Sequence, residues 1–207
     1  MTWLSPGFPV GAFAFSHGVE AAIVDGVLHD RDSVRQWIST LIGQGSGWND
    51  LVLLAAAWRA DNSGDGAALD EAASLCIALG GSLERRAETA ALGAAFIEAA
   101  RPWADMPHAL PYPVAVGAVA ARCGVGIEPT LAAYAHAFAA NLTTAATRLI
   151  PLGQSDMVHI AHRLELPCLA AARRAATSGL DGLGSAAFLS DIAAMRHETQ
   201  KTRVFRS

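Results

Sequence analysis

The sequence predicts an all-α protein: a single globular helical domain, residues 1–207, of about nine or ten helices around a central buried helix. Apolar residues recur at intervals of three and four positions, whereas period-2 alternation is absent and β-branched residues are scattered. Alanine, which favours helix intrinsically, is the most prominent compositional bias. A chain of 207 residues can bury a large core without disulfides or a structural metal.

The central helix is predicted between Pro129 and Pro151. A proline suits the first turn of a helix, and the residue before a proline is disfavoured in the α conformation. The intervening residues would span about 31 Å at ~1.5 Å per residue. Small and apolar residues occupy nearly every face of this stretch, which predicts a buried helix with closely packed neighbours. We expect His136, alone on this apolar helix, to be a core histidine.

The first half of the chain predicts an extended lead and five helices. Two prolines restrict the backbone of residues 4–13. The clearest helical pattern follows N-cap candidates at residues 30–33 and is the apolar stripe formed by Val34, Trp37, Ile38, Leu41 and Ile42. The other helices are expected at residues 16–25, from Asn49 or Asp50 to about Ala60, at 67–79 and at 82–100.

The second half begins with residues 101–113, where four prolines predict irregular structure. Besides the central helix, further helices are expected at residues 114–123, 155–164, 167–178 and 185–197. Pro167 is the reason for separating the second and third of these, because proline disfavours the α conformation in the residue before it.

The composition limits the classes of function that fit the chain. Apolar residues make up 52% of the chain and charged residues only 16%, so apolar surface is available either for a core or for partners. A net charge of −4 argues against nucleic-acid binding. The three cysteines, Cys76, Cys123 and Cys168, are odd in number and form no C-x-x-C pair, which favours reduced thiols in the cytoplasm. We expect no signal peptide.

A membrane-embedded protein is the first rival reading. The central helix is long enough to cross a bilayer, but it is rich in alanine, lacks charged flanks and contains His136, Asn141 and Arg148. We therefore expect no membrane span.

Motifs for catalysis are absent or weak. There is no P-loop and no G-x-S-x-G elbow. The second rival reading is a metal-site enzyme that uses His159, His162 and Glu165, which lie three residues apart. Zinc enzymes of this kind place two histidines four residues apart, so a solvated helix face is the simpler interpretation. Glu84, Arg85, Arg86 and Glu88 are interpreted as an exposed helix turn with paired charges.

The C-terminal residues are unusual. Phe188, Ile192 and Met195 form one apolar stripe, and residues 196–207 then carry four arginines and lysines in an acidic chain. A terminal segment is by default frayed and solvated. The aromatic Phe205 near the end, flanked by arginines, has instead the composition of an interface anchor. The residues alone leave both readings open.

Several motifs resemble those of the UreF family of urease accessory proteins, over nearly the whole chain. They are Leu4-Ser5-Pro6, Pro9-Val10-Gly11-Ala12-Phe13, Ser16-x-Gly18-x-Glu20, Arg86-x-Glu88-Thr89-x-x-x-Gly93, Tyr112-Pro113-Val114-x-Val116-Gly117, Arg148-Leu149-Ile150-Pro151-Leu152-Gly153-Gln154 and residues 195–207. Phe15 and His17 depart from the pattern, where tyrosine and glutamine are usual. The order and spacing of these motifs make the resemblance specific.

The resemblance implies an all-helical, homodimeric, cytoplasmic chaperone without catalytic residues. Proteins of this family bind the accessory protein UreD, also called UreH, and recruit the GTPase UreG. The complex delivers nickel to apo-urease, so nickel would be handled by the assembled complex and no cofactor would be held tightly by this chain. The alternative implied by the family is a GTPase-activating regulator of UreG.

The resemblance, together with the composition of the tail, also leads to a site prediction. We expect residues 196–207 to be a segment whose order depends on a partner, with Arg203 as its key residue. Arg203 is expected to fold back toward residues 8–20, where Glu20 offers a carboxylate. The predicted partner-binding residues are Ser16, Glu20, Arg196, His197, Glu198, Thr199, Gln200, Thr202, Arg203, Phe205 and Arg206.

Overall fold

The computed structural model describes residues 2–106 and 108–206. Within these ranges it contains helices and no strand, which confirms the all-α prediction. The α-helices are α1 (Val19–Val24), α2 (Arg31–Gln44), α3 (Ser46–Ser63), α4 (Gly66–Ala78), α5 (Leu83–Ala100), α6 (Tyr112–Arg122), α7 (Ile127–Thr147), α8 (Gln154–Thr177) and α9 (Phe188–His197). Three short 3-10 helices lie at Thr2–Leu4, Ala12–Ala14 and Leu180–Gly182.

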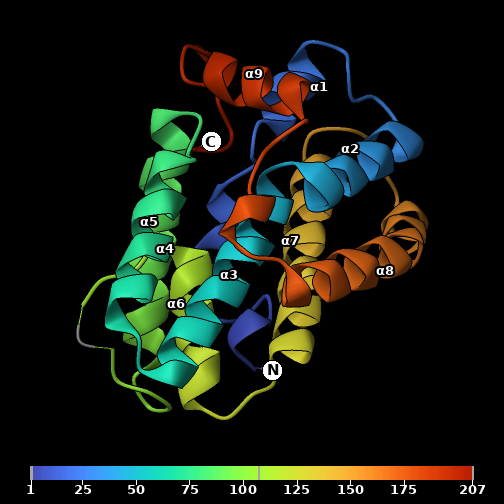
Figure 1. Ribbon diagram of the computed structural model, residues 1–207. Helices are drawn as coiled ribbons and strands as arrows, with labels where there is room; N and C mark the ends of the chain where they lie inside the picture. The colour runs from blue at the N-terminus through green and yellow to red at the C-terminus, as the bar shows by residue number, and fades with distance from the viewer. Residues whose placement is uncertain (1, 107, 207) are drawn as a thin grey trace.

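The helices form two groups around α3. Figure 1 shows α4, α5 and α6 on one side of α3, and α2, α7 and α8 on the other. The short helices α1 and α9 lie together at one end, although they come from opposite ends of the sequence. This end brings the two terminal segments of the chain into contact.

Helix α3 lies between the two groups, and its tightest neighbour is α6. Residues 51–55 of α3 are all buried, and a Cβ on Gly117 of α6 would lie 2.3 Å from the carbonyl oxygen of Leu54. Only glycine therefore permits the approach of these two helices. The core around them is built mainly from alanine, valine and leucine.

Helix α7 is the predicted central helix, and it packs against α8, α3, α2, α1 and α6. It begins at Ile127, so Pro129 lies in its first turn, and it ends before Pro151 as expected. One strip of α7 stays open to solvent. His136, which we expected in the core, is exposed there.

Helix α8 corrects the prediction of two helices at residues 155–164 and 167–178. It runs without interruption through Pro167. Its buried residues lie on both sides of the proline, and packing against α7 and α2 outweighs the hydrogen bond that proline removes. The buried residues of α8 are Ile160, Leu164, Cys168, Ala171, Ala172 and Ala175.

Helix starts were predicted well where a side chain caps the helix. Asp30 accepts the Ser33 N–H in a capping box, and Ser82 accepts the Arg85 N–H. Helix α3 starts earlier than expected, at Ser46. Asn49 instead accepts the N–H of Gly184, and Asp50 accepts the hydroxyl of Tyr134.

No helix in the described ranges is long and apolar enough to cross a membrane. The three cysteines are free thiols.

Candidate partner-binding site at the C-terminal tail

The tail comprises residues 196–207, and its described part, residues 196–206, begins in the last turn of α9 and lies beside α1 and the start of α5 (Figure 1). Its backbone pairs with the N-terminal segment, since the N–H of Arg206 donates to the carbonyl of Ala14 at 2.8 Å. The site therefore combines residues from both ends of the chain. Residues 196–206 are folded onto the rest of the chain.

Glu20 is the main acceptor for the tail. Its side chain is buried, and its carboxylate accepts the backbone N–H groups of Val204 at 2.8 Å and Phe205 at 2.9 Å. The side-chain amide of Gln200 lies 3.5 Å away. Ser16, also buried, accepts the N–H of Glu20 through its hydroxyl at 3.4 Å.

The turn into α1 allows α9 to come close. His17 and Gly18 both have positive φ, 52° and 78°. A Cβ on Gly18 would lie 2.9 Å from the backbone nitrogen of Ala194 in α9. Glycine is therefore needed at this position both for the backbone conformation and for the approach of α9.

His197, the last residue of α9, is fully buried between two carboxylates. Its Nε2 atom lies 3.2 Å from Glu20, and its Nδ1 atom lies 2.7 Å from Glu84 of α5. The ring thus joins three helices. We predicted His197 as a partner-binding residue, but within the isolated chain its contacts are internal.

Arg203 pairs with Glu84 rather than with Glu20. The tail folds back to the N-terminal segment as expected, but the expectation that Glu20 would receive Arg203 is wrong. The physical reason is that backbone N–H groups already occupy the oxygens of Glu20. Glu84 is partly exposed, which suits a guanidinium group that also reaches solvent.

Phe205 anchors the tail. Its ring is buried, and the guanidinium carbon of Arg148 lies 4.8 Å from the ring centroid. Arg148 also donates to the carbonyl of Phe13 at 3.3 Å. A cation over an aromatic ring is attracted by the negative face of the ring, so Arg148 holds both terminal segments.

The other predicted tail residues divide into two groups. Glu198 caps α5 by accepting the N–H of Leu83 at 2.6 Å, so it acts within the chain. Arg196 pairs with Asp25 at 2.8 Å but remains mostly exposed. The tail residues with exposed surface are Arg196, Thr199, Lys201, Thr202, Arg203, Val204 and Arg206. These are the side chains that a partner can reach without moving the tail.

The outer face of α9 extends this accessible surface. The stripe predicted from the sequence is exposed: Phe188 by 69%, Ile192 by 47% and Met195 by 48%. The inner face carries Ser190, Ala193 and His197. The helix therefore turns its large apolar side chains to solvent and its small and polar ones to the protein, which is the reverse of an ordinary surface helix.

A groove adjoins the stripe. It has a volume of about 370 Å³ and lies between α2 and the start of α9. Its apolar lining includes Val27, Trp37, Leu41, Phe188 and Leu189. An exposed apolar stripe beside an apolar groove is typical of a protein-binding surface.

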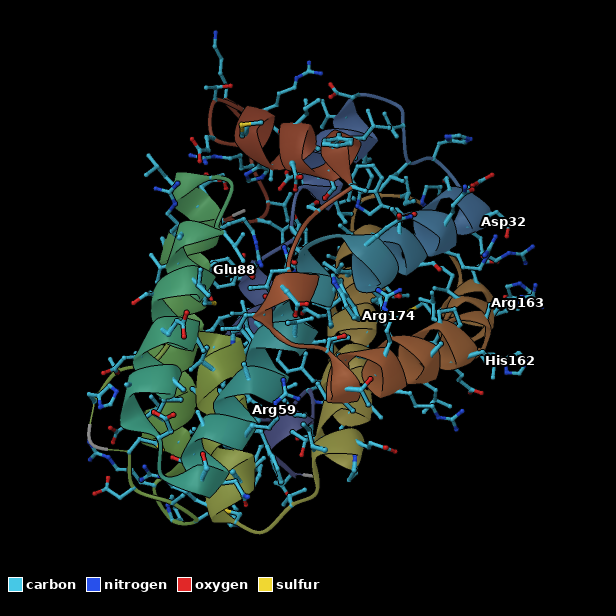
Figure 2. All side chains as sticks on the ribbon, viewed as in Figure 1. Asp32, Arg59, Glu88, His162, Arg163 and Arg174 are labelled. Atoms are coloured by element: carbon cyan, nitrogen blue, oxygen red, sulfur yellow. The ribbon has the colours of Figure 1, made fainter. Side chains whose placement is uncertain are left out.

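A second cluster, near the tail, is a buried charge network that contains Arg85 and Glu88. The prediction that these two residues lie on an exposed helix turn is therefore wrong. Arg85 and Glu88 pair at 2.6 Å, and His17 lies 2.8 Å from Glu88. Figure 2 shows Glu88 on the side of α5 that faces α3. The helical period could have revealed this, because Arg85 and Glu88 share a face of α5 with Phe96.

In this network, burial and charge pairing shift the pKa values of the carboxyl groups in opposite directions. Burial alone would raise the pKa of Glu88, but Arg85 and His17 outweigh it and hold the pKa at about 2. Burial raises the pKa of Asp50, which Arg85, His17 and the Tyr134 hydroxyl only partly offset. Both Asp50 and Arg85 line a cavity of about 360 Å³ beneath the N-terminal segment.

The rival metal site lies elsewhere. His159, His162 and Glu165 are exposed on α8, with 3.7 Å between His162 and Glu165. Figure 2 shows His162 and Arg163 projecting outward from that helix. Over residues 2–106 and 108–206, no three His, Cys, Asp or Glu side chains are placed together as metal ligands would be.

The chain matches known proteins over its whole length. The family model for UreF matches residues 28–165. A urease accessory protein UreF from Mesorhizobium japonicum is 49% identical, with 100% of this chain and 94% of that protein covered. Proteins of the same name from Rhizobium etli and Agrobacterium fabrum are each 50% identical, covering 99% and 100% of this chain and 93% and 94% of their own lengths. The chain therefore belongs to the UreF family of urease accessory proteins.

Proposed function

We propose that this protein is a non-catalytic, cytoplasmic scaffold for urease maturation. It binds a UreD/UreH-type accessory protein and recruits a UreG-type GTPase, and the assembled complex delivers nickel to apo-urease. The observation that carries the proposal is the apolar stripe that α9 turns to solvent. A large exposed apolar patch on a protein usually marks a surface that a partner covers. Membership of the UreF family supports this choice of partners.

The size of the α9 surface supports a specific interface. We group Val27, Phe188, Leu189, Ile192 and Met195 as the α9 surface. With typical residue surface areas, the exposed parts of these five residues add up to roughly 500 Å². The largest apolar patch on a typical monomer covers about 300–600 Å², so this patch lies in the upper part of that range. Its area equals the apolar share of one side of a standard interface, about 800 Å² at ~65% apolar. We assign this surface to the UreD/UreH-type protein.

The tail lies next to the α9 surface and supplies its polar rim. Exposed Arg196, Thr199, Thr202, Arg203 and Arg206 offer hydrogen-bond donors around an apolar centre, the usual arrangement in protein interfaces. Recruitment of the GTPase to this composite surface would require the tail. If one of the exposed arginines reached the nucleotide, the protein would also accelerate GTP hydrolysis.

A second apolar surface, on α8, suits a homodimer. Val158 and Leu166 are highly exposed. Val158 also lines a hollow of about 240 Å³, together with His136, Ala140 and Glu165. A two-fold contact requires projecting and hollow parts on the same surface. We assign this surface to a second copy of the chain, which leaves α9 free for other partners. Nickel is then cargo of the assembly rather than a cofactor of this chain.

Co-purification with a UreD/UreH-type protein tests the proposal. The double variant Ile192→Ser/Met195→Ser removes apolar area from the α9 surface without touching the core. We expect at least a tenfold loss of affinity, because central apolar residues of an interface each contribute about 1–2 kcal/mol. The matched control is Leu166→Ser on α8, which should keep the partner but weaken self-association. Equal recovery of the partner by wild type and double variant would refute the proposal.

A further inference from the structure

We propose that the cavity beneath the N-terminal segment binds a small neutral molecule with a carboxamide head on an aromatic or other apolar body. This is the cavity of about 360 Å³ that Asp50 and Arg85 line. The site is formed by this chain alone. Its test therefore requires no partner protein and can fail or succeed independently of the proposed function.

The cavity has the size and the lining of a small-molecule site. Pockets for organic ligands usually measure about 300–1,000 Å³ and are lined mainly by apolar and aromatic side chains. An apolar cavity of about 150 Å³ is already large enough for benzene. Here the wall includes the aromatic residues Phe8, Tyr112 and Phe138. The cavity therefore has room for an aromatic ring with a polar substituent.

The wall of the cavity is formed by packed side chains. Residues 3–13 make up one side of it. Phe8 of this segment packs against Phe96, with 5.8 Å between the ring centroids. The ring of Tyr112 contacts both Phe96 and Tyr134, at centroid distances of 5.7 Å and 5.6 Å. A wall that is already ordered lowers the entropy cost of binding a ligand.

Three polar side chains that line the cavity have unused hydrogen-bonding groups. One oxygen of Asp50 accepts the hydroxyl of Tyr134 at 3.0 Å, which leaves the other oxygen without a partner among the described residues. The side-chain contacts of Arg85 within the described ranges all involve Nη1, so its remaining N–H groups are unused. The hydroxyl of Tyr112 has no hydrogen-bond partner in the described part of the chain. All three residues keep part of their surface accessible.

A carboxamide matches these unused groups. Polar groups inside a protein almost always have hydrogen-bond partners, so a molecule in the cavity is expected to supply them. Burial raises the pKa of Tyr112, so its hydroxyl keeps the hydrogen at neutral pH and can donate it. The carbonyl oxygen of a carboxamide can accept from Tyr112 or Arg85, and its NH₂ group can donate to Asp50.

The charges around the cavity favour a neutral head over a charged one. Arg85 and Asp50 are of opposite type and line the same cavity, so an anionic or a cationic head would meet one of them as a like charge. Glu88 already pairs with Arg85 at 2.6 Å, which leaves no dedicated counter-ion for an anion. A charged head would also lose its hydration in a largely apolar cavity, which is costly without a counter-ion.

Nuclear magnetic resonance titration of the full chain tests the site with four probes that share a benzene ring. Benzamide carries the carboxamide, benzoate an anion, benzylammonium a cation, and toluene no polar head. We expect benzamide to shift the backbone amide signals of residues 3–13 and Tyr112 saturably, with a Kd on the order of 1 mM or tighter. The other three probes should bind more weakly by about fivefold or more, because each lacks matched hydrogen bonds.

The same titration can overturn the proposal in two ways. The absence of a saturable shift with benzamide would show that the cavity takes water and no organic ligand. Equal or tighter binding of benzoate, benzylammonium or toluene would show that the carboxamide head is not recognised.

Two variants test whether benzamide occupies this cavity. Tyr112→Phe removes only the unpartnered hydroxyl, so we expect the same Tm and a Kd that is about fivefold weaker, the effect of one net hydrogen bond. Ala137→Leu adds bulk to the wall and should abolish binding. Its matched control is Ala94→Leu at an exposed position of α5, which should bind benzamide like wild type. Undiminished binding in both Tyr112→Phe and Ala137→Leu would contradict a site in this cavity.

Discussion

The carboxylate of Glu20 accepts the backbone N–H of Phe205 at 2.9 Å, although the two residues are 185 positions apart in the sequence. This bond joins the first α-helix of the chain to the tail. Because the Val204 N–H binds the same carboxylate, a single side chain fixes the path of the tail. The exposed tail residues thereby keep a defined position beside the α9 surface.

Glu20→Gln should loosen the tail without unfolding the protein. An amide side chain has one acceptor oxygen and no charge, so it cannot replace both charge-assisted bonds, each of which contributes about 1.5–3 kcal/mol. We expect amide exchange in residues 203–206 to become about 10- to 100-fold faster by mass spectrometry. Glu98→Gln, at an exposed end of α5, is the matched control. Unaltered exchange in the tail of Glu20→Gln would contradict the role of this carboxylate.

Phe205→Ala should release the tail through loss of its anchor. Removing a buried aromatic side chain costs about 3–5 kcal/mol in a protein core, and here the tail can detach before the rest unfolds. We expect loss of protection in the tail with a small change in Tm. The neighbouring Val204 is mostly exposed, so Val204→Ala should change neither quantity. Similar exchange rates in the two variants would show that Phe205 is not the anchor.

Glu88 should contribute to acid unfolding. Its pKa in the folded protein is about 2, below the ordinary value of 4.5, so its stabilisation is complete above pH 4.5 and is lost as pH falls toward 2. The shift corresponds to about 3 kcal/mol. Urea unfolding at several pH values should show this loss in wild type. Glu88→Gln should be less stable at pH 7 and have a shallower pH dependence between 4.5 and 2; parallel curves would rule out the contribution.

Two glycine substitutions should change the stability of the folded protein in opposite directions. Gly117→Ala forces a methyl group against the backbone of α3. We expect the free energy of unfolding to fall by about 3 kcal/mol or more, at or above the upper end of the ~1–3 kcal/mol that overpacking usually costs. Gly43→Ala lies in α2 with open space around its Cβ position, so higher helix propensity should add about 0.5–1 kcal/mol. Thermal unfolding distinguishes the two. Comparable Tm values for both variants would contradict the close approach of α3 and α6.

The sequence predicted the fold where local signals and packing agree. The stripe from Val34 to Ile42 and the cap at Asp30 placed α2 correctly, because both act within a few residues. Pro167 misled the prediction, since packing of α8 on two neighbouring helices overrides a local preference. Burial of Arg85 and Glu88 was missed because charged residues are usually exposed and their partner His17 is distant in sequence.

The site was predicted in outline and not in detail. The composition of the tail identified Phe205 and the arginines as candidates for contact, and the stripe on α9 was visible as a helical pattern. The sequence did not predict that the stripe would face solvent, because which face of a short helix is buried depends on the elements that it meets. Nor did it indicate that Glu84 would receive both His197 and Arg203, since that requires three separate segments to converge.

Assembly on a size-exclusion column tests the central claim most directly. The full-length chain and a version that ends at Met195 would each be mixed with a UreD/UreH-type protein and a UreG-type GTPase. The shortened chain keeps the whole α9 surface, and circular dichroism and Tm would first be used to check that it is folded. We predict that the full-length chain alone brings the GTPase into the complex. Equal assembly by both versions would contradict a partner-binding role for the tail.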